Sequence, residues 1–163
     1  MIEQIRDLLV EKFGGEAIIR LDEQPLQPIL VVHAGYIERI GFFLRDTEGC
    51  YFDFLSNISA VDYFPEDRFS VVYYLASLPY QTQVTLKIEL QNNRDLKQLP
   101  EVDSVSAVWR TADWHEREAF DLMGIFFRNH PDLRRILLPD DWDGYPLRKD
   151  YVDAESYHGI TIK

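Results

Sequence analysis

Acid–base chemistry is the reaction type that the side chains of this chain could most readily support. His115 and Glu116 are adjacent, and His130 follows them in the same third of the chain. A histidine titrates near neutral pH, and a carboxylate close to it could share its proton. His115-Glu116 also begins like the helix of a zinc protease, but Ala119 stands where the second histidine would be needed, which excludes that motif. An acid–base site of His115, Glu116 and His130 therefore competes with simple packing or capping roles.

The other chemically active residues form no pattern typical of a cofactor or metal site. Cys50 is the only cysteine, which excludes an internal disulfide and any cluster or zinc site held by cysteines of this chain alone. Residues 140–143 are rich in aspartate but lack the alternation and the final glutamate of a calcium loop. Gly14-Gly15 lacks the spacing of a nucleotide-binding loop. We therefore expect no metal or cofactor to be bound by this chain.

A helix predicted over residues 111–123 must position most of these side chains. Thr111 or Asp113 can cap its beginning, and Gly124 stands where a left-handed residue would end it. Spacing of three and four residues gives one mostly apolar stripe, made of Ala112, His115, Glu116, Ala119, Phe120 and Met123. The charged residues predicted to lie outside the stripe are Arg117, Glu118 and Asp121.

A carboxylate beside that apolar stripe needs a cation as its partner. Glu116 is such a carboxylate, and burying it unpaired would be costly. The arginines that follow the helix are Arg134, Arg135 and Arg148. We therefore predict that Glu116 or Glu118 anchors the following segment to the helix through an ion pair with one of them.

Residues 128–163 are predicted to be irregular without being disordered. Three prolines interrupt the segment, yet it is rich in apolar residues: Leu133, Ile136, Leu137, Leu138, Trp142, Tyr145 and Leu147. A compact domain seldom contains so long an irregular stretch, and these apolar side chains need a surface to cover them. The sequence therefore predicts a globular domain over residues 1–127 and an extended arm over residues 128–163 that binds a partner.

The first hundred residues favour an α+β fold, in which helices cover one face of a mostly antiparallel sheet. Helical spacing covers residues 2–13 and 33–46. Strand candidates cover residues 16–21, 29–32, 51–63, 69–78 and 83–90, and short turns join the last three into a meander. Residues 92–103 are predicted to be a polar connector.

Composition excludes several classes of function. The 163 residues are 46% hydrophobic, as expected for one globular domain. The formal net charge of −11 argues against nucleic acid and against docking on an anionic membrane. No apolar run is long enough to span a bilayer, and the beginning of the chain has no signal-peptide layout. We expect a protein that is soluble when isolated and cytoplasmic.

The sequence from Glu116 to Leu137 resembles the signature of the 30 kDa subunit family of respiratory complex I, whose members are the C subunits of the bacterial proton-pumping NADH–quinone oxidoreductase. The matching residues are Glu116, Arg117, Glu118, Asp121, Gly124, His130, Pro131, Arg134 and Arg135. The resemblance continues through residues 138–151 and reaches back to residues 106–109 and 59–63.

The resemblance implies a non-catalytic structural subunit of the peripheral arm of the complex, on the cytoplasmic side of the inner membrane. Members of the family bind no flavin, iron–sulfur cluster or quinone themselves; FMN and the clusters lie in partner subunits. The implied partners are the complex I subunits D, B and I. The first of these is the large quinone-site subunit, against which the arm would be buried, and the other two lie nearby. The complex, rather than this subunit, would be the enzyme that transfers electrons from NADH to quinone.

Four residues of the arm are predicted to anchor it on a partner: Arg134, Trp142, Tyr145 and Arg148. Tryptophan, tyrosine and arginine are the residue types that most often dominate binding energy at such interfaces. The same family also serves ferredoxin-linked complexes, F420 dehydrogenases and membrane-bound hydrogenases. The residues do not specify the electron donor or the quinone type.

Overall fold

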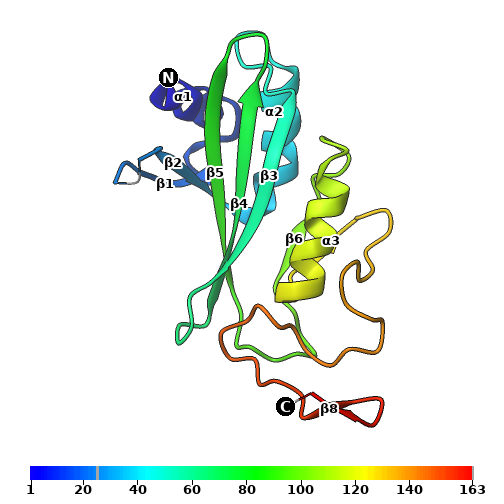
Figure 1. The fold of residues 1–163 in the computed structure, drawn as a ribbon. Helices are drawn as coiled ribbons and strands as arrows, with labels where there is room; N and C mark the ends of the chain where they lie inside the picture. Colours follow the sequence, from blue (N-terminus) through cyan, green and yellow to red (C-terminus); the bar gives the residue numbers. More distant parts are fainter. Residues whose placement is uncertain (25, 163) are drawn as a thin grey trace.

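The computed structural model describes residues 1–24 and 26–162 (Figure 1). No helix in these residues is both long and apolar enough to cross a membrane. The elements follow in the order α1 (Ile2–Phe13), η1 (Gly15–Ala17), β1 (Ile18–Asp22), β2 (Ile29–Val32), η2 (Ala34–Tyr36), α2 (Ile37–Asp46), β3 (Phe54–Asp62), β4 (Arg68–Ser77), β5 (Thr82–Gln91), β6 (Glu101–Asp103), α3 (Ala112–Met123), β7 (Phe126–Arg128), β8 (Ser156–Tyr157) and β9 (Ile160–Thr161).

Five strands form one sheet in the order β1-β2-β5-β4-β3. β3, β4 and β5 are antiparallel neighbours, which confirms the predicted meander. β1 and β2 form an antiparallel hairpin, and β2 lies parallel to β5. Leu30, Val31 and Val32 of β2 are all buried, as is typical of a strand covered on both faces. The α+β class and the mostly antiparallel sheet are therefore confirmed, with one parallel pair that the sequence did not predict.

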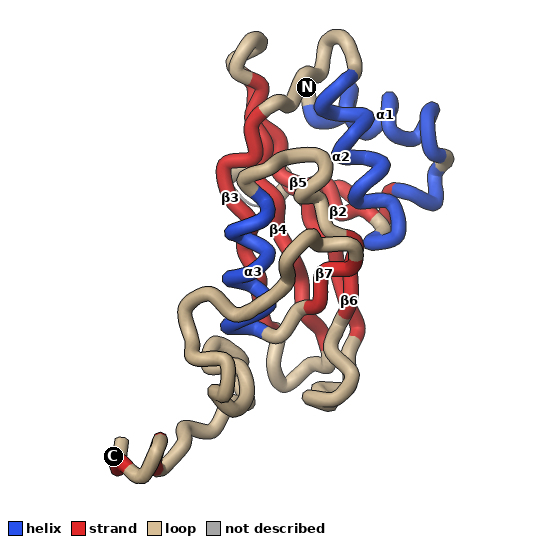
Figure 2. Tube along the Cα trace, turned by 90° about the vertical axis from the view of Figure 1, so that its right-hand side faces the viewer, coloured by secondary structure: helices blue, strands red, loops and turns tan. Residues whose placement is uncertain are grey.

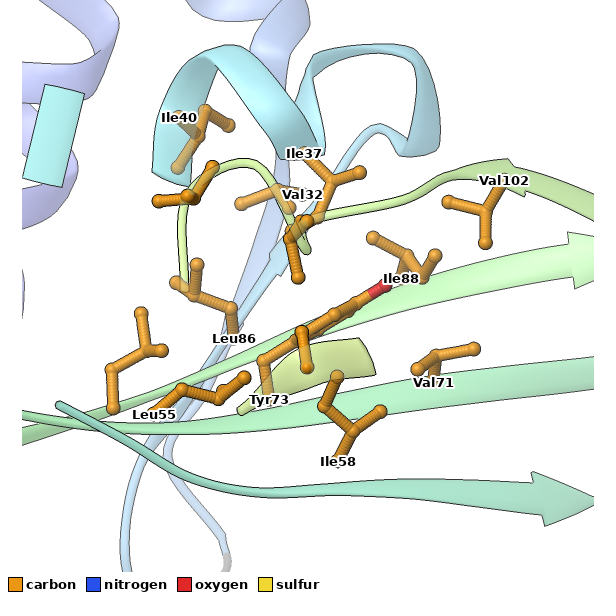
Figure 3. Close-up of a cluster of buried hydrophobic side chains, with 14 of the residues drawn as sticks. Val32, Ile37, Ile40, Leu55, Ile58, Val71, Tyr73, Leu86, Ile88 and Val102 are labelled. Carbon is orange, nitrogen blue, oxygen red and sulfur yellow. The ribbon is translucent and has the colours of Figure 1, made fainter. Parts of the chain in front are cut away.

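One face of the sheet carries the core. Alternate residues of the two central strands form it: Phe69, Val71, Tyr73 and Leu75 on β4, and Val84, Leu86, Ile88 and Leu90 on β5. Figure 3 shows several of these side chains beneath Ile37 and Ile40 of α2. α1 contributes Ile5 and Leu9 to the same core, and α3 contributes as well, so the helices cover one face as predicted. Cys50 is buried in this core, as expected for a small apolar residue, and burial raises the pKa of its thiol.

β6 and β7 form a second, two-stranded parallel sheet, with α3 between them in the chain. Val102 and Phe127 lie opposite each other and are buried. At the exposed end, Nε of Arg128 donates to Oδ1 of Asp103 at 2.9 Å. The prediction that residues 92–103 are a connector is therefore wrong for the last three. A strand of three residues is too short to show a detectable alternation.

Residues 129–155 form no helix or strand, as predicted for the arm. The described chain then closes in the hairpin of β8 and β9, which lies below the rest of the molecule in Figure 1. Tyr157 of this hairpin packs on Trp142 with ring centroids 5.3 Å apart, and its hydroxyl donates to Asp141 at 2.8 Å. The boundary predicted after residue 127 falls inside β7, which ends at Arg128.

Candidate partner interface

α3 carries most of the sequence motif and is buried on two sides. It ends at Gly124, whose φ of 65° and ψ of 45° form the left-handed C-cap that the sequence predicts. The predicted stripe faces the core through Ala112, Glu116, Ala119 and Met123. Arg117 and Asp121, predicted to lie outside the stripe, are buried as well. They are buried because the arm runs along this second side of the helix (Figure 2).

Asp121 attaches the arm to α3. Its Oδ2 accepts hydrogen bonds from the backbone N–H groups of Ile136, Leu137 and Leu138, at 3.1, 2.7 and 2.9 Å. Its Oδ1 accepts from Nη1 of Arg135 at 2.7 Å. Burial by itself would raise the pKa of Asp121, but these donors outweigh burial and hold the pKa below its ordinary value. The carboxylate is therefore kept ionised inside the protein.

Two guanidinium groups complete this attachment. Nε and Nη2 of Arg117 donate to the carbonyl oxygens of Arg134 and Arg135, at 3.2 and 3.0 Å. Nη2 of Arg135 donates to the carbonyl oxygens of Trp142 and Gly144, at 2.9 and 3.1 Å. A guanidinium carries five donors in a fixed plane, so one side chain can hold several carbonyl groups of an irregular segment. The first part of the arm is therefore folded by contacts within the chain.

The ion pair predicted for Glu116 or Glu118 is wrong. In residues 1–24 and 26–162, neither glutamate lies within ion-pair distance of an arginine, whereas Asp121 pairs with Arg135. The cause is the direction of each side chain around the helix. Glu116 points toward the chain segment after β6, Glu118 is exposed, and Asp121 points toward the arm.

Glu116 is a buried acid whose direct hydrogen-bond donors are both uncharged. Its side chain is 0% exposed. Oε1 accepts from the N–H of Val105 at 2.7 Å, and Oε2 accepts from the hydroxyl of Ser104 at 2.5 Å. Burial raises the pKa of Glu116 from 4.5 to about 7, against the opposing effect of these two hydrogen bonds, and the charge of Asp113 adds to the rise. This carboxyl group therefore exchanges its proton near neutral pH.

His130 holds the beginning of the arm against α3. Its Nε2 lies 3.1 Å from the carbonyl oxygen of Asp113 and 3.9 Å from Oε2 of Glu116. Its Nδ1 accepts a hydrogen bond from the N–H of Asp132 at 3.0 Å. Because Nδ1 accepts, the proton of the neutral ring lies on Nε2 and is donated to Asp113. The ring thus fixes the turn that contains Pro131.

The three residues considered for an acid–base site do not come together. Glu116 and His130 are neighbours, but both side chains are fully buried and closed to a substrate. His115 lies on another side of α3, where it lines a cavity of about 190 Å³ with Glu118 and residues of β3. In the described part of the chain, no three His, Cys, Asp or Glu side chains are grouped to hold a metal ion. The geometry does not support this catalytic site.

The arm also closes the C-terminal end of α3. Arg148, which is 4% exposed, donates from Nε to the carbonyl oxygen of Met123 at 2.8 Å and from Nη2 to that of Gly124 at 3.2 Å. A cation is favoured at this end of a helix. The ring of Tyr145 lies so close to Gly124 that a Cβ there would meet two ring carbons at 2.6 Å. Arg148 therefore holds its own helix and is not exposed to a partner, which corrects its predicted role as an anchor.

The other predicted anchors differ in exposure. The side chain of Arg134 is 68% exposed and pairs with Asp132 at 2.8 Å. Trp142 and Tyr145 are half-buried, and Nε1 of Trp142 donates to the hydroxyl of Tyr151 at 3.2 Å. Their binding to a partner stays a prediction.

The sequence interpretation missed a second attachment of the arm, at the end of β3. Asp62 is buried, and its carboxylate accepts from Nη2 of Arg94 at 2.6 Å and from the backbone N–H of Lys149 at 2.8 Å. Burial would raise the pKa of Asp62, but these donors and the N–H of Phe64 hold it below its ordinary value. The available signal was an aspartate at the end of a mostly apolar strand, since a buried carboxylate requires donors.

Comparison with protein families now identifies the motif. Residues 30–157 match the family described as the 30 kDa subunit of respiratory-chain NADH dehydrogenase. The chain belongs to this family. The matched region begins in β2 and ends in β8, so it contains α3 and both attachments of the arm. The resemblance stated from the motif is confirmed.

Relatives within the 30 kDa family are similar over almost the whole chain. The NADH-quinone oxidoreductase C subunit of Chloroherpeton thalassium is 46% identical over 157 residues, which cover 95% of this chain and 62% of that protein. The C subunit of Chlorobium phaeobacteroides is 40% identical, covering 96% of this chain and 92% of that protein. The C subunit of Geobacter sulfurreducens is 47% identical, covering 93% and 92%.

The fold of this 30 kDa family member also has a match among solved structures. A chain of the membrane-bound sulfane sulfur reductase, an archaeal respiratory membrane complex, superposes with a TM-score of 0.73. The match covers 92% of this chain and 85% of that chain, at 22% sequence identity. At this identity the similarity shows the shared fold.

Proposed function

We propose that this chain is the C subunit of a complex I-type, proton-translocating NADH–quinone oxidoreductase. The observation that carries the proposal is membership of the 30 kDa family, with relatives of that name 40–47% identical over 93–96% of the chain. In such a complex electrons pass from NADH through FMN and iron–sulfur clusters in other subunits to quinone. This chain supports the transfer as a structural subunit of the peripheral arm, without catalysing a step.

Two observations support a non-catalytic role. The only acid close to a histidine in the motif, Glu116 beside His130, is sealed inside the protein, where its direct partners belong to the chain itself. The chain has one cysteine, whereas an iron–sulfur cluster is usually held by several thiolates. We therefore assign the flavin and the clusters to the partner subunits.

The arm is the proposed interface to the large quinone-site subunit, with subunits B and I nearby, on the cytoplasmic side of the inner membrane. It exposes large apolar side chains that no part of the described chain covers: Leu137, Leu147, Val152, Ile160 and Ile162. Exposed apolar residues gathered on one segment are typical of protein interfaces. Because Asp121, Arg135 and Arg148 already fold the segment, a partner meets a largely preformed surface. The arm therefore needs less help from its partner than the sequence suggests.

The proposal is tested by complementation. A host that lacks its own C subunit is given this chain, and NADH-dependent quinone reduction is measured in its membranes alongside the reaction with reduced ferredoxin or reduced F420. Restored NADH activity, together with co-purification of subunits B, D and I, is the expected result. The isolated chain should show no visible absorbance and no NADH oxidation. Flavin, iron or turnover in the isolated chain, or assembly of the complex without it, would contradict the proposal.

A further inference from the structure

A cavity of about 380 Å³ lies between the arm and the loop that follows β5. The loop and the arm each supply one arginine and apolar or aromatic groups to its walls: Arg94 and Leu96 from the loop, and Tyr145, Arg148, Tyr151 and Val152 from the arm. Each wall is held in place from within the chain. Asp62 binds Arg94 on one side and the backbone of Lys149 on the other.

Both arginines of this cavity carry a buried N–H without an acceptor. In the described residues, Nη1 of Arg148 and Nε of Arg94 are buried and make no hydrogen bond. The other donors of each group are engaged, and both guanidinium carbons lie close to the ring centroid of Phe69, at 4.9 and 5.0 Å. A buried donor without an acceptor costs free energy, and native proteins rarely leave one. An acceptor from outside the chain is therefore expected at this cavity.

The charges around the cavity favour a neutral acceptor. Asp143 and Asp150 also line it and balance the two arginines, and Oδ2 of Asp150 lies 3.4 Å from Nη1 of Arg94. A free anion would meet two carboxylates in a site without net positive charge. A carbonyl oxygen can accept from a guanidinium without adding a charge.

The rim of the cavity favours an occupant that is partly apolar. Leu96 is 56% exposed and Val152 is 83% exposed, one on each wall. Water alone would fill the cavity but would leave both side chains uncovered. A protein segment offers both parts at once, because each residue brings a backbone carbonyl and a side chain.

We propose that this cavity receives a segment of a partner subunit, whose backbone carbonyl accepts a hydrogen bond from Arg148 and whose apolar side chain lies between Leu96 and Val152. The proposal rests on the proposed function, since it requires a neighbouring subunit. It places part of the interface on the loop after β5, outside the arm. One partner segment would therefore contact two distant parts of the sequence.

Photo-crosslinking in the assembled complex tests the position of the partner. The photoreactive residue p-benzoylphenylalanine replaces Leu96 or Val152 in cells that assemble the complex, and Ile19 on β1 serves as the reference position because it is also exposed. Residues 96 and 152 should crosslink to one and the same subunit, about fivefold more than position 19 does. Crosslinking of both positions at the level of position 19, in a complex that contains the chain, would overturn the inference. Absence of the chain from the complex would instead overturn the proposed function.

A pair of substitutions at one position tests the apolar contact. Val152→Asp should lower the fraction of chain that stays with the complex after a high-salt wash by about fivefold, whereas Val152→Leu should leave it unchanged. Both variants should keep the unfolding midpoint of the isolated chain, because this side chain is mostly exposed. Equal retention of the two variants would overturn the inference.

Discussion

Replacing Glu116 by glutamine should remove a pH dependence from the stability of the chain. Burial raises the pKa of Glu116 from its ordinary value of 4.5 to about 7. Between these values the folded chain holds a proton that the unfolded chain has released, so this group lowers stability progressively as the pH rises, and its full cost is present above about pH 7. At about 1.4 kcal/mol per pH unit, the cost amounts to roughly 3 kcal/mol.

Glutamine is a suitable replacement because it keeps the local hydrogen bonds. Its side-chain oxygen can accept from the N–H of Val105, and its amide group can donate to the hydroxyl of Ser104. At pH 5 the variant and the original chain should differ by less than about 1 kcal/mol. At pH 8 the glutamine variant should be more stable by roughly 3 kcal/mol.

The assay is denaturant unfolding of the isolated chain at several pH values from 5 to 8, followed by tryptophan fluorescence. His130 and Asp113 are present in both chains, so the difference between the two stability curves isolates Glu116. Glu118→Gln, an exposed change on the same helix, is the control and should follow the pH dependence of the original chain. Parallel curves for Glu116→Gln and the original chain would refute the reasoning.

Three further predictions concern the arm. Asp121→Ala leaves three backbone N–H groups and Arg135 without their acceptor, so it should destabilise the chain by about 3–5 kcal/mol and speed tryptic cleavage after residue 135; unchanged cleavage would contradict this attachment. Gly124→Ala should cost about 3 kcal/mol in thermal unfolding, through its positive φ and the ring beside it, whereas Gly49→Ala, also at positive φ but with no atom within 4 Å of its Cβ, should cost about 1 kcal/mol. Because its donors hold the pKa of Asp121 below 3.8, the arm should remain attached at pH 5 and be released only as the pH falls below that value, which Trp142 fluorescence can follow; release already at pH 5 would contradict it.

The fold was largely predictable where apolar periodicity is strong. The helix over residues 2–13 and the strand over residues 29–32 have the predicted bounds, and the meander follows from the alternation in β5. The neighbour of β2 was not predictable, because a short run of apolar residues does not state which distant strand it joins. β6 was missed because its pairing with β7 is decided by tertiary contacts across α3.

The site was predictable as a motif but not as a set of contacts. The apolar periodicity correctly placed Glu116 next to the stripe, and an arginine was therefore predicted as its partner. It could not show that Ser104 and Val105 would supply neutral donors, because the turn after β6 folds back onto the helix. It also treated Asp121 as an outward residue, since periodicity alone cannot show that a later segment will cover a second side.

The two-sided burial of α3 has a consequence for synthesis. β6, α3 and β7 are close in sequence and can assemble as soon as they leave the ribosome, whereas the segment that covers Asp121 emerges later. Until then the waiting side of the helix presents Arg117 and Asp121 to water. The unfinished chain therefore exposes charged groups there instead of a sticky apolar surface, which lowers its tendency to aggregate before the last residues are made.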